Sequence, residues 1–230
     1  MVVKAVNHWV EYSRGLEPNA FPPQPLTSKD LDLLGHRGVV KQIGKMLGVE
    51  PYIPRQDDVT PESGHIKVLM ADGRELKIDF LNDSMPNTQN VIKSTMVGFQ
   101  TEEGRFFVMH PAQCLKSRVH NVMNLPGYDN PHGIGQMVAA IKVVPIFCQS
   151  LLDQGAEKAE QRVMAIYNDL FKYSRTRVPK KLWKEKQINT FDAVKPLRGM
   201  NREFAAECYP RWLRTVGRVN TGHILGAPDP

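Results

Sequence analysis

Two short segments in which charged and apolar residues alternate set the strongest limit on the fold of this chain. Residues 30–34 read Asp-Leu-Asp-Leu-Leu, and residues 76–80 read Leu-Lys-Ile-Asp-Phe. Successive side chains on a β-strand point to opposite faces, so each segment predicts a strand with one apolar and one charged face. Asp30 and Asp32 then share the charged face of the first strand, and Asp79 lies on the charged face of the second.

These three carboxylates converge if the two strands are neighbours in one sheet. Carboxylates held together repel one another unless cations neutralise them. Oxygen ligands of this kind suit Mg²⁺, which retains water molecules and also binds substrate phosphates. The pattern therefore predicts a metal-assisted phosphoryl or nucleotidyl transfer site, with Asp30, Asp32 and Asp79 as metal ligands and catalytic residues. The alternative is a solvated acidic rim on the sheet that holds no ion.

The rest of the chain predicts further strands in its first half and helices in its second half. Alternating residues on both sides of Asp72-Gly73 predict a β-hairpin, because this dipeptide favours a tight turn. Periodic apolar residues predict the helices. The expected elements are helices at 4–14, 37–47, 111–124, 132–153, 156–175, 180–187 and 201–215, a strand at 28–34, and hairpins over 66–80 and 95–109.

The change of pattern near residue 110 predicts an α+β protein with two domains and a tail. Residues 1–109 are expected to form an α/β domain whose mixed sheet, flanked by helices, contains mostly antiparallel strand pairs. Residues 110–220 are expected to form an all-helical domain. Residues 221–230, which are rich in Gly and Pro, are expected to be a tail.

The composition predicts a globular protein of the cytoplasm. Apolar residues make up 41% of the chain and charged residues 23%, which is typical of a packed domain. No apolar run is expected to be long enough to span a bilayer, and the N-terminus lacks a signal-peptide pattern, so no membrane partner is expected. Three widely spaced cysteines, Cys114, Cys148 and Cys208, predict buried free thiols more than disulfides.

One segment is strongly basic. The whole chain has a net charge of +6, which is compatible with a polyanionic partner. Residues 172–186 contain seven basic residues and one acid, with Tyr173 and Trp183 between them. This segment predicts either a nucleic-acid surface, on which cations hold phosphates and aromatic rings stack on bases, or a solvated helix face with Trp183 in the core.

Three motifs follow one another along the chain. Residues 28–32 have the pattern Ser-x-Asp-hydrophobic-Asp, and residues 77–79 have the pattern Lys-hydrophobic-Asp. A basic position follows within residues 114–118, where Arg118 fits better than Lys116. This order resembles the DNA polymerase beta-like nucleotidyltransferase superfamily, and in particular its bacterial and phage branch, which includes abortive-infection toxin nucleotidyltransferases. The likeness covers about the first two thirds of the chain.

The resemblance implies a fold, an activity and a cofactor. It implies a nucleotidyltransferase-like sheet and the transfer of an NMP group from an NTP to an acceptor hydroxyl on RNA (tRNA ends in the toxin relatives), a protein or a small molecule. The implied cofactor is Mg²⁺ or Mn²⁺, with two ions bridged by Asp30 and Asp32 and with Asp79 on the acceptor-side ion. A role as a toxin or phage-defence component with a cognate antitoxin as partner is also implied.

The resemblance also implies substrate-binding residues at the matching motif positions. These are Ser28 in the first motif and Lys77, Lys116 and Arg118 as phosphate ligands, with Arg binding as a fork and Lys as a point charge. Lys116 and Arg118 lie two positions apart on a predicted helix and point in different directions, so at most one is expected at the site. The alternative for both is a solvated helix face.

Two family features are missing from this sequence. Toxin relatives carry an acidic position in a later Arg-Asp-type motif, and the comparable residues 131–136 offer only His132 and Gln136. The other missing feature is the phosphate-binding turn. In the family, a strand and a Gly-Gly or Gly-Ser turn precede the first helix, and their backbone N–H groups cradle the triphosphate. Here Val2, Val3 and Lys4 precede the helix without a glycine, and no strand is expected before it. A side chain in this turn would place a Cβ atom where the phosphates approach. The alternative function is therefore a catalytically inactive module of the same fold that binds nucleic acid or a partner protein. A metal-dependent phosphoesterase that uses the same acids is a third hypothesis.

Overall fold

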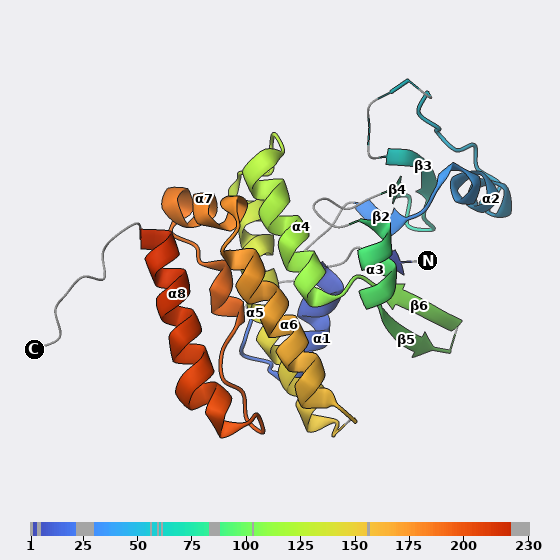
Figure 1. The fold of residues 1–230 in the computed structure, drawn as a ribbon. Coiled ribbons are helices and arrows are strands. Elements are labelled where there is room, and N and C mark those ends of the chain that lie inside the picture. The colour runs from blue at the N-terminus through green and yellow to red at the C-terminus, as the bar shows by residue number, and fades with distance from the viewer. Residues whose placement is uncertain are drawn as a thin grey trace, which may run out of the picture. The chain divides into compact units, whose positions relative to one another are not determined.

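Contacts between residues divide the chain into two compact units. The first comprises Met1–His8 and Pro23–Ser117, and the second comprises Trp9–Pro22 and Arg118–Pro230. Most helices and strands of both units are labelled in Figure 1. The structure is a computed structural model that describes residues 2–3, 6–21, 30–55, 57–58, 60, 62–82, 88–102, 104–155 and 157–221.

The first unit is built on a mixed six-stranded sheet with the strand order β3-β4-β2-β1-β6-β5. β2 and β4 are parallel neighbours, as are β1 and β6, and the other three neighbouring pairs are antiparallel. Both predicted hairpins are present, as β3–β4 and β5–β6, and the predicted α+β class is confirmed. The strands are β1 (Val2–Val3), β2 (Asp30–Leu34), β3 (Glu62–Leu69), β4 (Glu75–Leu81), β5 (Val97–Thr101) and β6 (Gly104–Val108).

The expectation that no strand precedes the first helix is wrong. β1 lies inside the sheet, where Val2 pairs with Leu34 of β2 on one side and with Phe107 of β6 on the other. Two residues are too few to show an alternating pattern, so this strand is defined by its two neighbours and not by its own sequence. It is followed by α1 (Val6–Leu16), which corresponds to the helix predicted at 4–14.

One helix of the first unit begins before the second predicted hairpin and is not among the predicted elements. α3 (Gln89–Thr95) has seven residues. Its Ile92 is fully buried, whereas the neighbouring Val91 is 39% exposed. A helix of two turns contains too few apolar positions to show the spacing by which helices are recognised, which explains why it is not predicted.

A hydrophobic core fixes which face of the sheet carries charge. Leu33 of β2, Ile66 of β3 and Phe80 of β4 are buried together with Val40 of α2 (Arg37–Leu47), a helix with the predicted bounds. Partners on neighbouring strands point to the same side of a sheet, so the opposite side of β2, β4 and β3 carries the polar residues that alternate with this core. This arrangement confirms the predicted apolar faces of both acidic strands.

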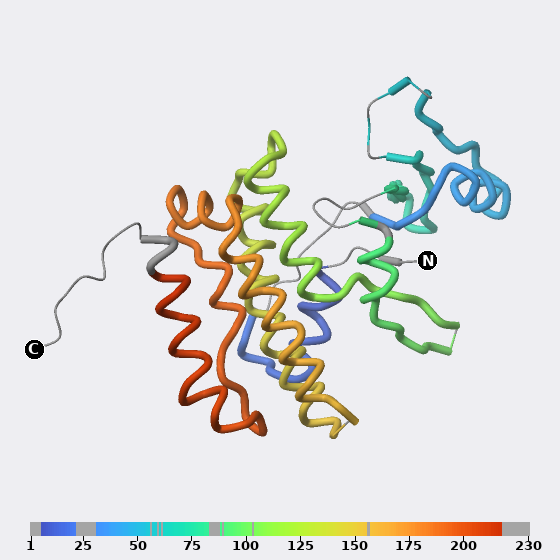
Figure 2. Tube along the Cα trace, viewed as in Figure 1, coloured from blue at the N-terminus to red at the C-terminus, as the bar shows by residue number. Residues whose placement is uncertain are grey.

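The second unit is helical, as predicted for the C-terminal half, and includes most of α1. Trp9 of α1 lies edge-on to Phe147 of α5, with ring centroids 5.1 Å apart, and both side chains are buried. α7 begins three residues earlier than predicted because Pro179 is tolerated in the first turn of a helix. The course of this unit can be followed in Figure 2. Its helices are α4 (Pro111–Asn124), α5 (Pro131–Asp153), α6 (Ala159–Ser174), α7 (Arg177–Lys186), a short 3-10 helix (Thr190–Ala193), a π-helical turn (Phe204–Cys208) and α8 (Tyr209–Thr221). The boundary between the units falls within α4, and the 3-10 helix is not predicted.

The expectation that no segment is long and apolar enough to cross a bilayer is wrong for α5. This helix has 23 residues and a mean hydropathy of 1.5 in its most apolar window, because Lys142 is its only basic residue and Asp153 its only acidic one. However, 67% of that window is buried within the protein. The helix therefore has the burial of a core helix, and a cytoplasmic location stays a prediction.

The predicted state of two cysteines is confirmed. Cys114 and Cys148 are buried free thiols, and Cys208 is a half-buried free thiol. Burial raises the pKa of Cys148 far above its ordinary value, so this thiol stays protonated and unreactive.

Gly64 allows β3 to bend next to its pairing with β4. The register of the two strands shifts between Glu62 and Gly64, and Gly64 has φ +147°. An added Cβ atom there would lie 2.4 Å from the backbone oxygen of Tyr52. We expect Gly64→Ala to lower the free energy of unfolding by about 2–4 kcal/mol, because the substitution combines backbone strain with a clash against the main chain.

Gly73→Ala in the hairpin turn is the matched control. Gly73 also has a positive φ, +82°, but an added Cβ atom would meet nothing within 4 Å. We expect Gly73→Ala to lower the free energy of unfolding by about 1 kcal/mol, from backbone strain alone. Urea denaturation of the two variants measures both free energies of unfolding, and equal decreases would contradict the proposed role of Gly64.

Candidate metal centre

The parallel pairing of β2 with β4 brings predicted site residues onto neighbouring strands. Asp32 is the register partner of Asp79, and the backbone of Asp30 pairs with that of Lys77. Neighbouring strands in a sheet lie about 4.8 Å apart. The Asp32 and Asp79 side chains therefore extend next to each other from the face opposite the Leu33–Phe80 core. The backbone register that places these two acids on adjacent strands is present, and the roles of Asp30, Asp32 and Asp79 as metal ligands stay predictions.

Asp79 forms a close ion pair within its own strand. Its Oδ1 atom lies 2.6 Å from Nζ of Lys77, and the side chains of Asp79 and Lys77 are 15% and 35% exposed. The ammonium group therefore neutralises part of the carboxylate charge on this face of the sheet. Because Lys77 already contacts Asp79, a cation that binds Asp79 competes with the lysine. A displaced lysine would be available to bind phosphate, which is its predicted role.

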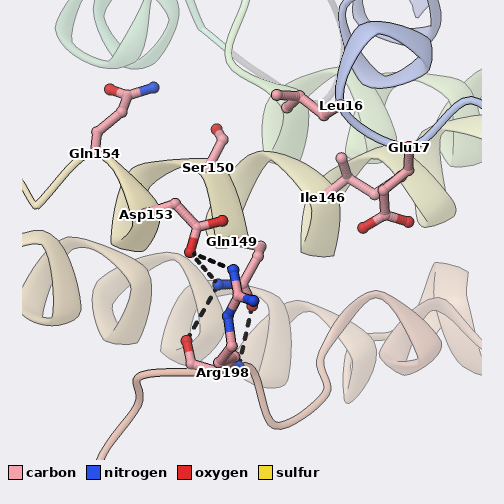
Figure 3. Close-up of a pocket in the computed structure, with 8 residues that line it drawn as sticks. All are labelled: Leu16, Glu17, Ile146, Gln149, Ser150, Asp153, Gln154 and Arg198. Carbon is pink, nitrogen blue, oxygen red and sulfur yellow. Dashed lines mark hydrogen bonds and ion pairs between the residues drawn. The ribbon is translucent and has the colours of Figure 1, made fainter.

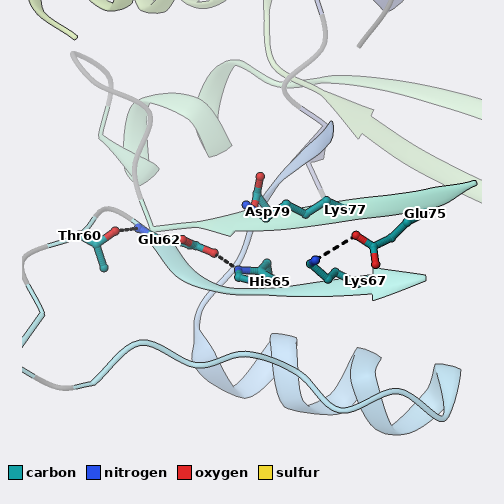
Figure 4. Close-up of polar contacts among 7 residues, drawn as sticks. All are labelled: Thr60, Glu62, His65, Lys67, Glu75, Lys77 and Asp79. Carbon is teal, nitrogen blue, oxygen red and sulfur yellow. Dashed lines mark hydrogen bonds and ion pairs between the residues drawn. The ribbon is translucent and has the colours of Figure 1, made fainter. Parts of the chain in front are cut away.

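Two further potential metal ligands come from β3, and neither of them is among the predicted site residues. His65 is the register partner of Asp79. Its Nδ1 atom lies 2.6 Å from Oε1 of Glu62, and one ligand atom from each of Glu62, His65 and Asp79 lies within 4.8 Å of the other two. All three residues are half-buried. Figure 4 shows these side chains on the adjacent strands β3 and β4.

Asp32, Asp79 and His65 thus follow one another across the three strands β2, β4 and β3. Carboxylates suit Mg²⁺ and Mn²⁺, and an imidazole nitrogen favours transition metals over Mg²⁺. The contact with Glu62 holds the His65 ring in one orientation, as a carboxylate commonly does for a metal-binding histidine. Among the described residues, Glu62, His65 and Asp79 form a group whose ligand atoms lie close enough to share one cation, and the Mg²⁺ or Mn²⁺ cofactor stays a prediction.

The register of the predicted hairpin already contains a signal for His65. The alternation that continues outwards from the Asp72-Gly73 turn pairs His65 with Asp79. Glu62 carries no such signal, because the irregularity at Gly64 interrupts the alternation and brings Glu62 towards His65.

The other predicted substrate-binding residues are divided between the two units or lie outside the described residues. Lys116 and Arg118 are half-buried on α4, but Lys116 belongs to the first unit and Arg118 to the second. Ser28 lies outside the described residues. Their phosphate-binding roles stay predictions.

A cavity of about 530 Å³ lies in the second unit, and polar contacts among the residues that line it join two segments of the chain (Figure 3). Nη2 of Arg198 lies 3.1 Å from Oδ1 of Asp153, and Nε2 of Gln149 donates a hydrogen bond of 2.9 Å to the same oxygen atom. These bonds lower the pKa of Asp153. Arg198 and Asp153 are thus paired with each other, and this contact fastens the segment at Arg198 to α5.

Comparisons with known proteins do not assign a family to this chain. No protein-family model, no curated protein and no solved structure matches it. A proposal for its function therefore depends on the geometry of the charged face of the sheet.

The metal centre predicts that divalent cations stabilise the protein through Asp79. At a Mn²⁺ concentration ten times the dissociation constant, binding to the native state contributes about 1.4 kcal/mol, or a rise in Tm of about 3–6 °C. We expect Asp79→Asn to remove most of this rise, because the substitution takes away the carboxylate that lies between Asp32 and His65.

Asp72→Asn is the matched control in the same hairpin. Asp72 also pairs with a basic residue two positions away, since Arg74 hydrogen bonds to it and lowers its pKa, but it lies at the exposed turn. In thermal melts with and without Mn²⁺, the Tm of Asp72→Asn should rise by as much as the Tm of the wild type. An undiminished rise in Asp79→Asn would place the cation elsewhere.

Proposed function

We propose that the chain is a metal-dependent nucleotidyltransferase that moves an NMP group from an NTP to an acceptor hydroxyl and releases pyrophosphate. The observation that carries this proposal is the pairing of Asp32 with Asp79 on the parallel neighbours β2 and β4. Asp30 lies two residues before Asp32 on the same strand. The acceptor is RNA, a protein or a small molecule, and a toxin or phage-defence role with a cognate antitoxin belongs to the same proposal.

The order of elements at the start of the chain supports a nucleotidyltransferase-like fold. β1 is followed by α1, and the next described strand is β2, which carries Asp30 and Asp32. This strand–helix–acidic strand order is the one expected for a triphosphate site in the resembling superfamily. Lys4 and Ala5, which lie between β1 and α1 in the sequence, are outside the described residues.

Each residue of the site has a distinct proposed role. Asp30, Asp32 and Asp79 hold Mg²⁺ or Mn²⁺, and these ions would supply charge neutralisation at the phosphates and a lower pKa at the acceptor hydroxyl. Lys77, which contacts Asp79, binds a phosphate oxygen of the NTP. Glu62 orients His65 through Nδ1, which leaves Nε2 of His65 as a further ligand for the metal.

The missing glycine favours a second candidate, an inactive module of the same fold. Residues 2–5 read Val-Val-Lys-Ala, so no glycine provides the close backbone approach to phosphate that the superfamily uses. Such a module would bind nucleic acid or a partner protein without turnover.

Labelling with α-³²P NTPs tests the proposal. Purified chain is incubated with each NTP, Mg²⁺ or Mn²⁺, and either total RNA or total protein as acceptor. We expect a labelled product that EDTA abolishes, with a rate at least about 100-fold lower in Asp32→Asn and Asp79→Asn, because each substitution removes a metal ligand. Asp72→Asn should retain the wild-type rate.

The other outcomes separate the alternatives. Metal-dependent labelling that survives both Asp32→Asn and Asp79→Asn would reject this site. NTP binding or nucleic-acid binding without any turnover would support the inactive module, and hydrolysis of a phosphodiester without a transfer product would support the phosphoesterase.

A further inference from the structure

The positive net charge of the chain comes from one segment. The chain contains 30 Lys and Arg residues and 24 Asp and Glu residues. The segment 172–186 contains seven of the former and one of the latter, which leaves 23 of each in the rest of the chain. The net charge of +6 therefore has its source in the end of α6 and in α7, all within the second unit.

α7 separates its basic residues from its buried face. Leu182 is fully buried and Pro179 is buried, and these residues anchor the helix. Four basic residues lie at positions i, i+3, i+4 and i+7 and therefore share one face of the helix. We call this set the α7 basic stripe, and its members are Arg177, Lys180, Lys181 and Lys184, all of them exposed. At 1.5 Å per residue the stripe is about 10 Å long.

The stripe has little internal neutralisation. The Nζ atom of Lys181 lies 3.8 Å from the Glu185 carboxylate, the only acid in the segment. Lys186 pairs with Asp129 at 2.6 Å, but it lies off the stripe and is only 22% exposed. Like charges three and four positions apart destabilise a helix by about 0.2–0.5 kcal/mol per pair, so a bound polyanion would relieve a repulsion that the folded protein carries.

The surroundings of the stripe distinguish between classes of polyanion. None of the large hydrophobic side chains that are exposed in the described structure lies within 172–186. An amphipathic helix that lies in a membrane surface needs an apolar face to insert, and the apolar face of α7 is buried. Protein interfaces depend on buried aromatic or apolar anchors, which the stripe also lacks.

We propose that the α7 basic stripe binds the phosphate backbone of nucleic acid. A surface that offers only cations matches a ligand whose outer surface is a regular row of phosphates. Tyr173 and Trp183 are half-buried, so contact is through charge and not through base stacking, and binding is independent of sequence. The inference does not depend on the proposed nucleotidyl transfer, because the stripe and Asp79 belong to different units.

Binding of a 20-bp RNA duplex, measured by fluorescence anisotropy over a range of salt concentrations, tests the proposal. Lys180→Gln combined with Lys184→Gln removes two charges at i and i+4 and keeps good helix-forming residues. We expect this double variant to bind about tenfold more weakly near 0.1 M salt. The slope of log K against log salt should become shallower by about two units.

The matched control is Lys41→Gln combined with Lys45→Gln on α2. These lysines are also exposed and four positions apart on a helix, but they lie in the first unit. The control variant should retain wild-type affinity, and so should Asp79→Asn, whose loss of activity is the test of the catalytic site. Circular dichroism and Tm establish that each variant is folded.

Four results would overturn the proposal. These are unchanged affinity in the α7 double variant, an equal loss in the α2 double variant, loss of RNA binding in Asp79→Asn, and binding that does not depend on salt. A fifth result, binding to vesicles with 30% anionic lipid through Lys180 and Lys184 without any binding to RNA, would assign the stripe to a membrane surface instead.

Discussion

The parallel pairing of β2 with β4 is the interaction on which the candidate metal centre depends. Its register sets Leu33 beside Phe80 on one face and Asp32 beside Asp79 on the other. A slip of one residue would turn Asp32 towards α2 and would expose Leu33. Because burial of Leu33 and Phe80 against Val40 opposes such a slip, the hydrophobic core determines the position of the two acids. Stability and the geometry of the site are therefore set by the same backbone ladder.

The charged face of β2, β4 and β3 carries basic as well as acidic side chains, and these form pairs. Like charges directly opposite each other on neighbouring strands destabilise a sheet, and here Asp79 is paired with Lys77 while His65 is paired with Glu62. A cation or phosphate that binds this face must exchange these partners for new ones. The free energy of binding is then the difference between two sets of contacts, which favours ligands of high charge density such as divalent ions and triphosphates.

The two units differ in charge. The first unit contains as many acidic as basic residues, whereas the second carries the whole net charge of +6 because of segment 172–186. A neutral unit can hold cations without a large background field, and a basic unit attracts polyanions over a distance that salt limits to about 8–10 Å. The proposed chemistry and the proposed nucleic-acid surface thus draw on separate electrostatic features of one chain.

The sequence by itself determined the two hairpins, the bounds of α2 and α4, and the polar and apolar faces of β2 and β4, because alternation and helical spacing are local properties. The hairpin register also implied that His65 faces Asp79. Only the tertiary structure decided that β1 is a strand and that Glu62 approaches His65 across the irregularity at Gly64. It also decided that β2 lies next to β4, since these pairings join residues far apart in the chain, and their register depends on core packing that no local pattern records.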